Sequence, residues 1–254
     1  MARRVIDRTG ERFITAKELG SYEIVIVSHE NSHSTFVQFQ DSHKAIVHTT
    51  YQHCKNGQVK NPYHPCIFGI GFIGVGKYVA TVNNINTKEY NTWRAMIERC
   101  YSDEFKLSHT TYEESYASTY FHNFQNFGEW YEENYYEVDN EEMCLDKDIL
   151  VKGNKMYSPE TCVFVPKRIN SLFTKNDKYR GDFPIGVSYY EDRDKYMASC
   201  HGMFLGYYDT IESAFLTYKN YKEKLIKQVA DEYKDKIPKK LYDALYNYEV
   251  EITD

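Results

Sequence analysis

Short segments in which apolar and polar residues alternate open the chain. Alternation with a period of two is typical of β-strands that bury one face. Three such segments occupy residues 22–27, 34–39 and 44–49. The dipeptide Asn56-Gly57 favours a tight hairpin turn after them. The pattern therefore predicts a small β-rich module over residues 1–66.

Glycines interrupt the next segment, FGIGFIGVGKY, at residues 68–78. A glycine-rich loop that cradles a phosphate is one interpretation, but no Lys-Ser or Lys-Thr pair closes the loop. The alternating Ile, Phe and Val residues fit a strand instead. We therefore expect a strand and linker over residues 67–87, and no nucleotide cofactor.

Helical periodicity replaces alternation after residue 87. Residues 88–101 and 116–131 each place apolar side chains three or four positions apart, as a helix with one buried face requires. The first predicted stripe is Trp93, Met96, Ile97 and Cys100, and the second is Tyr120, Phe124, Phe127 and Trp130. Such stripes are typical of a hydrophobic core rather than of a cofactor site.

A strand, a Gly-Asn turn, a second strand and a helix start follow over residues 145–170. This ββα order can hold one divalent cation between a strand-end carboxylate and a helix side chain. Asp146 and Asn170 are placed for those two roles, and Asp148, on the same strand face, offers a second carboxylate. Oxygen ligands of this kind favour a hard cation, Mg²⁺ or Mn²⁺.

The C-terminal third again predicts strands and then helices. Residues 184–190, 195–200 and 204–207 form three strands, and Asp209-Thr210 caps the helix that follows. The buried face of that helix is predicted as Ala214, Phe215, Tyr218, Tyr221 and Leu225. Pro238 separates it from a second, short helix in an acidic tail.

These elements predict an α+β protein. Its parts are a small β-rich module, a glycine-spaced linker, a ββα domain with preceding helices, a three-stranded sheet with a helix, and a tail. The corresponding ranges are 1–66, 67–87, 88–178, 179–231 and 232–254.

The net charge of −6 is unusual for a nucleic-acid binder, which is commonly basic. The charge is unevenly distributed, however. Residues 129–142 hold seven acids and no base, whereas residues 147–180 hold eight bases and three acids, a local charge of +5. A polyanion such as DNA would meet the second segment. The basic residues proposed to contact DNA there are Lys152, Lys155, Lys167, Arg168 and Lys175.

The six cysteines form no CxxC pair, and the pattern indicates free thiols in a reducing compartment. No signal peptide opens the chain, and no apolar run approaches the length of a membrane span. We therefore expect a cytoplasmic protein with no membrane partner. The group His53, Cys54, His64 and Cys66 matches no tight zinc spacing, and exposed His with buried Cys is the simpler interpretation.

Several motifs over residues 90–172 follow one another in a familiar order. They are WxxMxxRCY at 93–101, FxNFxxW at 124–130, Leu-Asp-Lys at 145–147 and YSPETC at 157–162. This region resembles the HNH nuclease family, in an altered version common in phage-encoded endonucleases. The resemblance implies a DNA endonuclease, of the homing type, that uses one Mg²⁺ or Mn²⁺. It places Asp146 and Asn170 at the outer metal positions, Lys147 at the catalytic His position and Thr161 at the middle Asn position.

The replacement of the catalytic His leaves the general base open. In one interpretation Lys147 contacts phosphate and another residue acts as base, with His122 the nearest candidate in the sequence. In the other, the domain binds DNA without cutting it. Asp146 also has a purely structural interpretation, as a strand-end residue that caps the loop at Gly153.

The C-terminal segment carries the motif G-V…Y-x-A…G…L-G-x-Y-D-T-x-E-x-A…Y. It resembles the Apetala-type, ethylene-response-factor-like, DNA-binding domain. The resemblance implies that the three-stranded sheet lies in the major groove of DNA. The residues at the facing positions are Ser188, Tyr190, Arg193, Lys195, Tyr196, Ser199 and His201. Few of them can make bidentate contacts with guanine, so we expect modest specificity. A sheet that only packs against the rest of the protein is the alternative.

Two functions thus remain open from the sequence. The first is a phage-type, Mg²⁺-dependent DNA endonuclease in the cytoplasm of an infected bacterium. The second is a catalytically inactive protein of the same architecture that binds DNA or a protein partner and regulates or inhibits a host factor.

Overall fold

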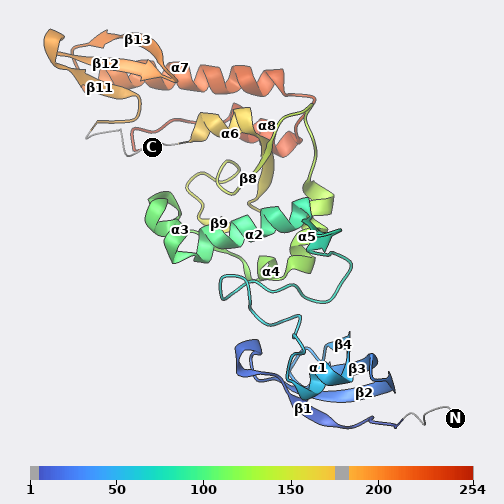
Figure 1. The fold of residues 1–254 in the computed structure, drawn as a ribbon. Helices are drawn as coiled ribbons and strands as arrows, with labels where there is room; N and C mark the ends of the chain where they lie inside the picture. Colours follow the sequence, from blue (N-terminus) through green and yellow to red (C-terminus); the bar gives the residue numbers. More distant parts are fainter. Residues whose placement is uncertain (1–5, 175–182, 254) are drawn as a thin grey trace. The chain divides into compact units, whose positions relative to one another are not determined.

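The computed structural model describes residues 6–174 and 183–253 of a mixed α+β protein (Figure 1). Contacts along the chain divide it into two compact units. The first comprises the residues up to Glu133 together with Lys155–Pro159, and the second comprises Asn134–Asn154 and the residues from Glu160 onwards. The predicted fold class is confirmed: an antiparallel sheet opens the chain, helices and small sheets follow, and a three-stranded sheet with a long helix lies near the end.

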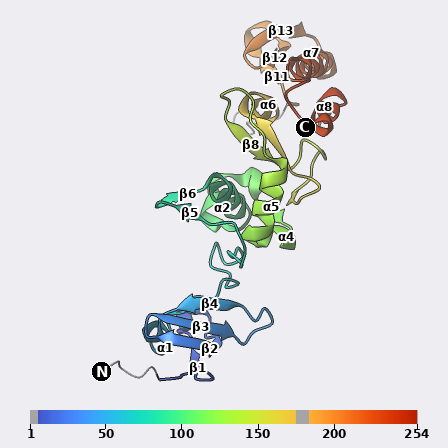
Figure 2. The same ribbon diagram turned by 90° about the vertical axis from the view of Figure 1, so that its right-hand side faces the viewer.

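The first unit begins with a four-stranded antiparallel sheet in the order β1-β2-β3-β4 (Figure 2). Its strands are β1 (Arg12–Ile14), β2 (Glu23–Asn31), β3 (Ser34–Phe39) and β4 (Ile46–Thr49). Alternate residues of β2 and β3 are buried with Cys54 of helix α1 (Tyr51–Lys55). The three strands predicted from alternation are therefore confirmed, and β1 is added to them.

The hairpin predicted at Asn56-Gly57 is wrong, because these residues end helix α1. The helix begins at Thr50, whose side chain accepts a hydrogen bond from the N–H of His53. Gly57 has a left-handed φ of +67°, and its N–H donates to the carbonyl of Cys54 at 3.2 Å. A Cβ at this position would lie 2.9 Å from the backbone nitrogen of Ala16. A glycine that ends a helix and a glycine in a hairpin turn both adopt a positive φ, so the local sequence does not distinguish them.

The strand predicted in the glycine-spaced segment is also absent from residues 67–78. Only two isolated bridges form there, Ile67 with Gly71 and Phe72 with Asn123. Gly69 and Gly74 adopt left-handed φ values that turn the chain. The spacing of Gly69, Gly71 and Gly74 is that of a dinucleotide fingerprint, but such a fingerprint lies between a strand and a helix. Here a short hairpin follows instead, β5 (Thr81–Val82) with β6 (Ile85–Asn86).

Helix α2 (Lys88–Tyr101) has the predicted bounds and buries the predicted stripe. The second predicted helix is divided into strand β7 (Tyr116–Ala117) and helices α4 (Thr119–His122) and α5 (Phe124–Asn134). The break lies at Asn123, whose Oδ1 accepts from the N–H of Gln125 at 2.9 Å. Because of it, Phe121 is buried while Tyr120 is 43% exposed. The first unit also contains helix α3 (Asp103–Ser108) and the 3₁₀ turns Lys17–Leu19 and Thr110–Tyr112.

The predicted ββα order is present, in the second unit. Strands β8 (Met143–Asp146) and β10 (Val163–Pro166) pair antiparallel, with Asp146 opposite Val163, and helix α6 (Lys167–Phe173) follows at once. The connection between the strands contains the predicted Gly-Asn turn: the N–H of Asn154 donates to the carbonyl of Val151 at 3.0 Å, and Gly153 has a left-handed φ of +78°. The connection also contains strand β9 (Met156–Tyr157), which belongs to the first unit and pairs there with β7.

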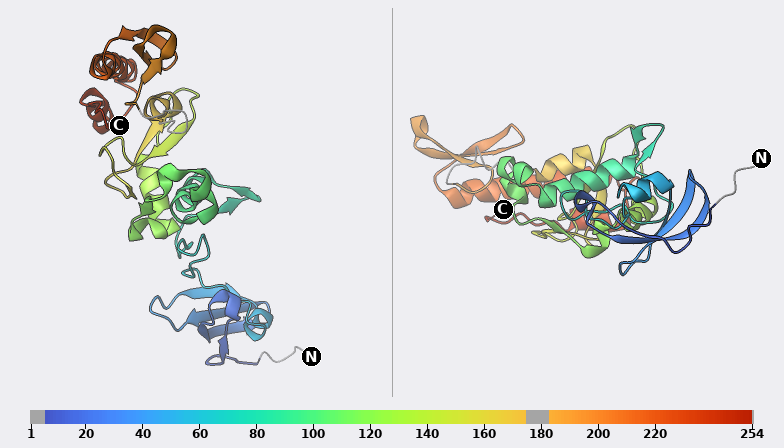
Figure 3. Two further views of the ribbon diagram at one scale, coloured as in Figure 1. Left: turned by 90° about the vertical axis from the view of Figure 1, so that its left-hand side faces the viewer. Right: turned by 60° about the horizontal axis from the view of Figure 1, so that its bottom comes forward.

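Three antiparallel strands and a long helix complete the second unit. The strands are β11 (Val187–Tyr190), β12 (Lys195–Cys200) and β13 (Met203–Tyr208), with a 3₁₀ turn at Glu191–Arg193. Thr210 caps helix α7 (Ile211–Glu232) by accepting from the N–H of Ser213. Helix α7 lies along one face of this sheet (Figures 1 and 3). The strands, the cap and the start of the helix are as predicted.

Helix α7 takes part in two hydrophobic cores. Its first half buries Ala214, Phe215 and Tyr218 against the three-stranded sheet. Its second half buries Ile226 and Val229 in a core shared with β10, α6 and the last helix, α8 (Lys239–Tyr246). Across residues 6–174 and 183–253, no helix is both long enough and apolar enough to span a membrane.

Candidate functional site

The turn after β8 is shaped by the carboxylate of Asp146. Its Oδ1 accepts hydrogen bonds from the backbone N–H groups of Asp148, at 2.9 Å, and Ile149, at 2.7 Å. Asn154 donates from Nδ2 to the carbonyl of Lys147 at 2.7 Å and holds the other side of the loop. Asp146 therefore has a structural role as a cap, as the simpler interpretation of the sequence had it, although the capped groups lie at 148–149.

Three charged side chains lie next to one another in this turn. Burial raises the pKa of Asp146 to about 6, and the nearby carboxylate of Asp148 adds to the effect. The Nζ of Lys147 lies 3.3 Å from Oδ2 of Asp148. The Lys147 side chain is only 9% exposed, whereas that of Asp148 is 45% exposed. The turn thus combines two adjoining carboxyl groups, one of which has a raised pKa, with the buried side chain of Lys147.

The side chains of this turn provide some of the oxygen ligands that a hard cation requires. Asp146 and Asp148 supply carboxylate oxygens side by side, which is the chemistry that Mg²⁺ and Mn²⁺ prefer. One oxygen of Asp146 is already engaged by two N–H groups. Asn170 lies on α6, and no hydrogen bond in the described residues links it to either carboxylate. The part of the chain that the structure describes contains no group of three or more His, Cys, Asp or Glu side chains arranged to share a metal ion.

The predicted alternative base, His122, is held within the first unit, whereas Asp146 lies in the second. The Nε2 of His122 lies 3.0 Å from the hydroxyl of Tyr101 and 3.2 Å from the carbonyl of Ala117. Burial lowers the pKa of the imidazole. These contacts tie the end of α4 to α2.

The basic residues that were predicted to contact DNA are paired with acids. The ion pairs are Lys152 with Glu251, Lys155 with Glu114, Lys167 with Glu142, and Arg168 with Glu232, at 2.6–3.7 Å. Lys152 also donates to the carbonyl of Glu249 at 2.8 Å. Lys175 lies outside the described residues. The local positive charge seen in the sequence is therefore largely balanced by acids from other parts of the chain.

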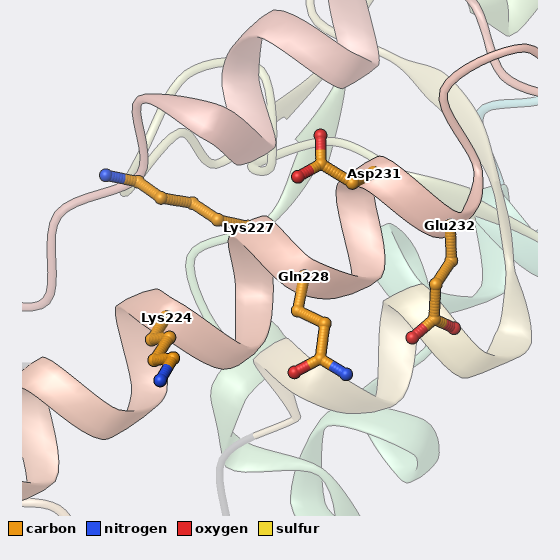
Figure 4. A pocket seen from close by; sticks show the side chains of 5 residues that line it. All are labelled: Lys224, Lys227, Gln228, Asp231 and Glu232. Carbon is orange, nitrogen blue, oxygen red and sulfur yellow. The ribbon is translucent and has the colours of Figure 1, made fainter.

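An open depression lies along helix α7, where five polar side chains line it (Figure 4). They are Lys224, Lys227, Gln228, Asp231 and Glu232. Both acids are engaged, Glu232 with Arg168 and Asp231 with the hydroxyl of Tyr242. With charges of both signs and engaged acids, the depression has the character of an ordinary solvated helix face.

The C-terminal sheet has one face covered by α7 and one face turned away from it. Val187, Ala198 and Cys200 lie in the core on the covered face. The alternate residues of β11 and β12 lie on the other face, together with the residues of β13 that pair with them. These are Ser188, Tyr190, Lys195, Met197, Ser199, Phe204 and Tyr207. The guanidinium of Arg193 lies over the ring of Tyr207, 4.8 Å from its centre. We call this surface the outer face.

Five of the seven residues predicted to face DNA lie at the outer face, Ser188 and Ser199 among them, and two do not. Tyr190, Arg193 and Lys195 are there, and Lys195 forms an ion pair with Asp209. Tyr196 packs instead into the core on the covered face, as the alternation within β12 requires. His201 lies in the turn after β12, where its Nε2 accepts from Nζ of buried Lys222 at 2.7 Å. Burial, with Lys222, lowers the pKa of His201, so this imidazole offers no positive charge to a phosphate.

Two residues of the outer face, Phe204 and Tyr207, escaped the sequence reasoning. They are three positions apart in β13, whereas residues on one face of a regular strand are two or four apart. The register shows why: Ser199 pairs with Phe204 and Ala198 with Gly206, so Leu205 has no partner in β12. This β-bulge shifts the alternation by one residue. The glycine at 206 was the one local signal of such an irregularity.

Comparisons of this chain with protein-family models, with curated proteins and with solved structures found no significant match.

Proposed function

We propose that this protein binds DNA through the outer face of its C-terminal sheet, in the cytoplasm of a phage-infected bacterium. One observation carries the proposal: helix α7 covers one face of β11–β13, while the other presents Tyr190, Arg193 and Lys195. These three are among the positions that the Apetala-type resemblance implies as DNA-contacting.

The physical character of the outer face supports weak sequence specificity. Among the described residues Arg193 is the one guanidinium group there, and Lys195 is already paired with Asp209. Bidentate contacts from Arg to guanine are the commonest specific contacts in the major groove. With one such group, base contacts contribute little discrimination, so shape and stacking dominate the interaction.

The test is the binding of a fluorescein-labelled DNA by the full chain, followed by fluorescence anisotropy at several salt concentrations. We expect affinity that falls as salt rises, because phosphate contacts release counterions. The double variant Arg193→Gln/Lys195→Gln should weaken binding and flatten the salt dependence. A wild-type chain that binds no DNA at low salt would refute the proposal and leave a protein partner as the alternative.

Hydrolysis of DNA is a second candidate function, and the carboxylate pair in the turn after β8 favours it. Two adjoining carboxylates, one with a pKa raised to about 6, repel each other unless a proton or a cation lies between them. Asp146 and Asp148 would hold one Mg²⁺ or Mn²⁺. A bound cation supplies positive charge to the phosphate and to the leaving oxygen. Lys147, paired with Asp148, would add charge rather than accept a proton.

Nicking of supercoiled plasmid with Mg²⁺ or Mn²⁺ tests this second function. We expect the wild type to nick, and Asp148→Asn to lose nicking while it keeps DNA binding, since Asp148 caps no backbone group. Binding without nicking by the wild type would identify a catalytically inactive protein, a regulator or an inhibitor of a host factor. That outcome would leave the DNA-binding proposal intact.

A further inference from the structure

We infer that the outer face of the C-terminal sheet binds single-stranded DNA by stacking its bases on a band of aromatic rings. This inference rests on the proposed function, that the outer face binds DNA. It adds the class of substrate: unpaired bases, rather than the edges of base pairs in an intact groove.

The aromatic band crosses the sheet from one edge to the other. The ring centres of Tyr190, on β11, and Tyr207, on β13, lie 5.3 Å apart, and those of Tyr207 and Phe204 lie 5.0 Å apart. Tyr190 is 37% exposed and Phe204 is 53% exposed. Tyr207, between them, is half-buried. Two exposed rings joined by a third on one sheet face are unusual for a surface in contact with water alone.

The neighbouring side chains leave the band standing above the sheet. In the register, Met197 of the central strand lies between Ser188 and Tyr207, and Ser199 lies beside Phe204. The serines are small, so they do not cover the rings. The guanidinium of Arg193 over Tyr207 adds a planar cation to the band. Aromatic rings with an adjoining Arg are the means by which sheets bind unpaired bases.

The same face is poorly suited to an intact groove. Groove readout depends on donors and acceptors that reach base edges, and Arg193 is the one residue here with a bidentate fork. Three acids, Glu191, Asp192 and Asp194, lie at the tip between β11 and β12. A duplex groove has a phosphate backbone on each side, so this tip would face phosphates. A single strand has one backbone, which can lie on the side away from the acids, and every base has a face for stacking.

The experiment compares a labelled 20-nucleotide oligo-dT with a duplex of the same length by fluorescence anisotropy, using the full chain. We expect tighter binding of the single strand. Phe204→Ala and Tyr207→Ala should each weaken it about ten-fold, since each removes a stacking ring. Phe204→Trp keeps a ring at the same place and should retain binding. Tyr246→Ala removes an exposed ring from helix α8, outside the outer face, and should leave binding unchanged.

The outcomes separate this inference from the function on which it rests. Duplex binding that equals or exceeds single-strand binding overturns the inference and leaves DNA binding in place. Binding of neither DNA overturns both, and a basic peptide, attracted by the acidic tip, becomes the better ligand for the rings. Equal losses in Phe204→Ala and Tyr246→Ala also overturn the inference. Thermal unfolding of each variant by circular dichroism identifies any loss that comes from misfolding.

Discussion

The turn after β8 and the outer face of the C-terminal sheet lie in the same unit and were both expected to act on DNA. In the turn, the polar groups bind one another: Asp146 accepts from two backbone N–H groups, and Lys147 pairs with Asp148. On the outer face, the rings of Tyr190, Phe204 and Tyr207 lie against one another, and the guanidinium of Arg193 lies over Tyr207.

This difference shows that basic residues clustered in the sequence need not be available to a ligand in the folded protein. The basic residues from 152 to 168 are balanced by acids up to 99 positions away, as in the pair of Lys152 with Glu251. An aromatic side chain, by contrast, carries no charge that an ion pair could neutralise. Unless packing covers its ring, it stays available to a ligand.

The turn should therefore respond to mutation through stability. Replacing Asp146 with Ala leaves two partly buried N–H groups without an acceptor, whereas Asn keeps an oxygen in the same place. Each unsatisfied donor costs about 1–3 kcal/mol, so we expect Asp146→Ala to be less stable than Asp146→Asn by about 3 kcal/mol. Urea unfolding monitored by circular dichroism measures the difference. Two variants of equal stability would show that the capping bonds contribute little.

The charge of Asp146 should make stability depend on pH. Its folded-state pKa of about 6 lies above the value of about 3.9 expected in the unfolded chain. Protonation therefore stabilises the fold: the contribution is complete below about pH 4 and is lost as pH rises through 6. At pH 7 we expect Asp146→Asn to be more stable than the wild type, by on the order of 2 kcal/mol.

Unfolding free energies of the two proteins between pH 4 and pH 8 test this dependence. The difference between them should shrink towards pH 4. A constant difference over this range would mean that Asp146 titrates alike in the folded and unfolded chains. Added Mg²⁺ should stabilise the wild type more than Asp146→Asn, if the pair holds a cation.

Two arginines in different surroundings provide a further test of the difference between the outer face and the basic segment. Arg193 lies over a ring on the outer face, whereas Arg168 is paired with Glu232 at 2.6 Å. We expect Arg193→Gln to weaken DNA binding about five-fold, because a charged, planar group is lost from the surface that binds DNA. Arg168→Gln should change it by less than about two-fold. The reverse order, measured by anisotropy at one salt concentration, would place the DNA on the basic segment instead.

The smallest effect is expected for the stability of Arg168→Gln itself. The side chains of Arg168 and Glu232 are 53% and 41% exposed, so solvent screens their attraction. The variant should shift the melting temperature by less than about 2 °C. A larger shift in differential scanning calorimetry would mean that the pair stabilises the contact of α6 with α7 far more than an exposed ion pair normally does.

Elements whose signals are local were predicted well. Helix α2 has the expected bounds because its apolar stripe and its cap at Thr87 lie within one segment. The cap at Thr210 and the three strands before it were found for the same reason. The pair Asn56-Gly57 was misassigned because a left-handed glycine serves both a hairpin and the end of a helix. The bond from the N–H of Gly57 to the carbonyl of Cys54 identifies a helix end here.

The residues of the candidate sites depended more on distant parts of the chain. Asp146 is the exception, because its place at a strand end and its bonds to residues 148–149 are both local. Phe204 and Tyr207 share a face only because Leu205 has no partner in β12. That irregularity depends on the pairing of two strands.

By itself, the sequence of this protein determined the kinds of elements and most of their order, because periodicity and caps act over a few residues. Tertiary structure decided which charges are balanced, which core each half of α7 enters, and which side chains remain exposed. Those properties depend on pairings between residues far apart in the chain, whose energies no local pattern records.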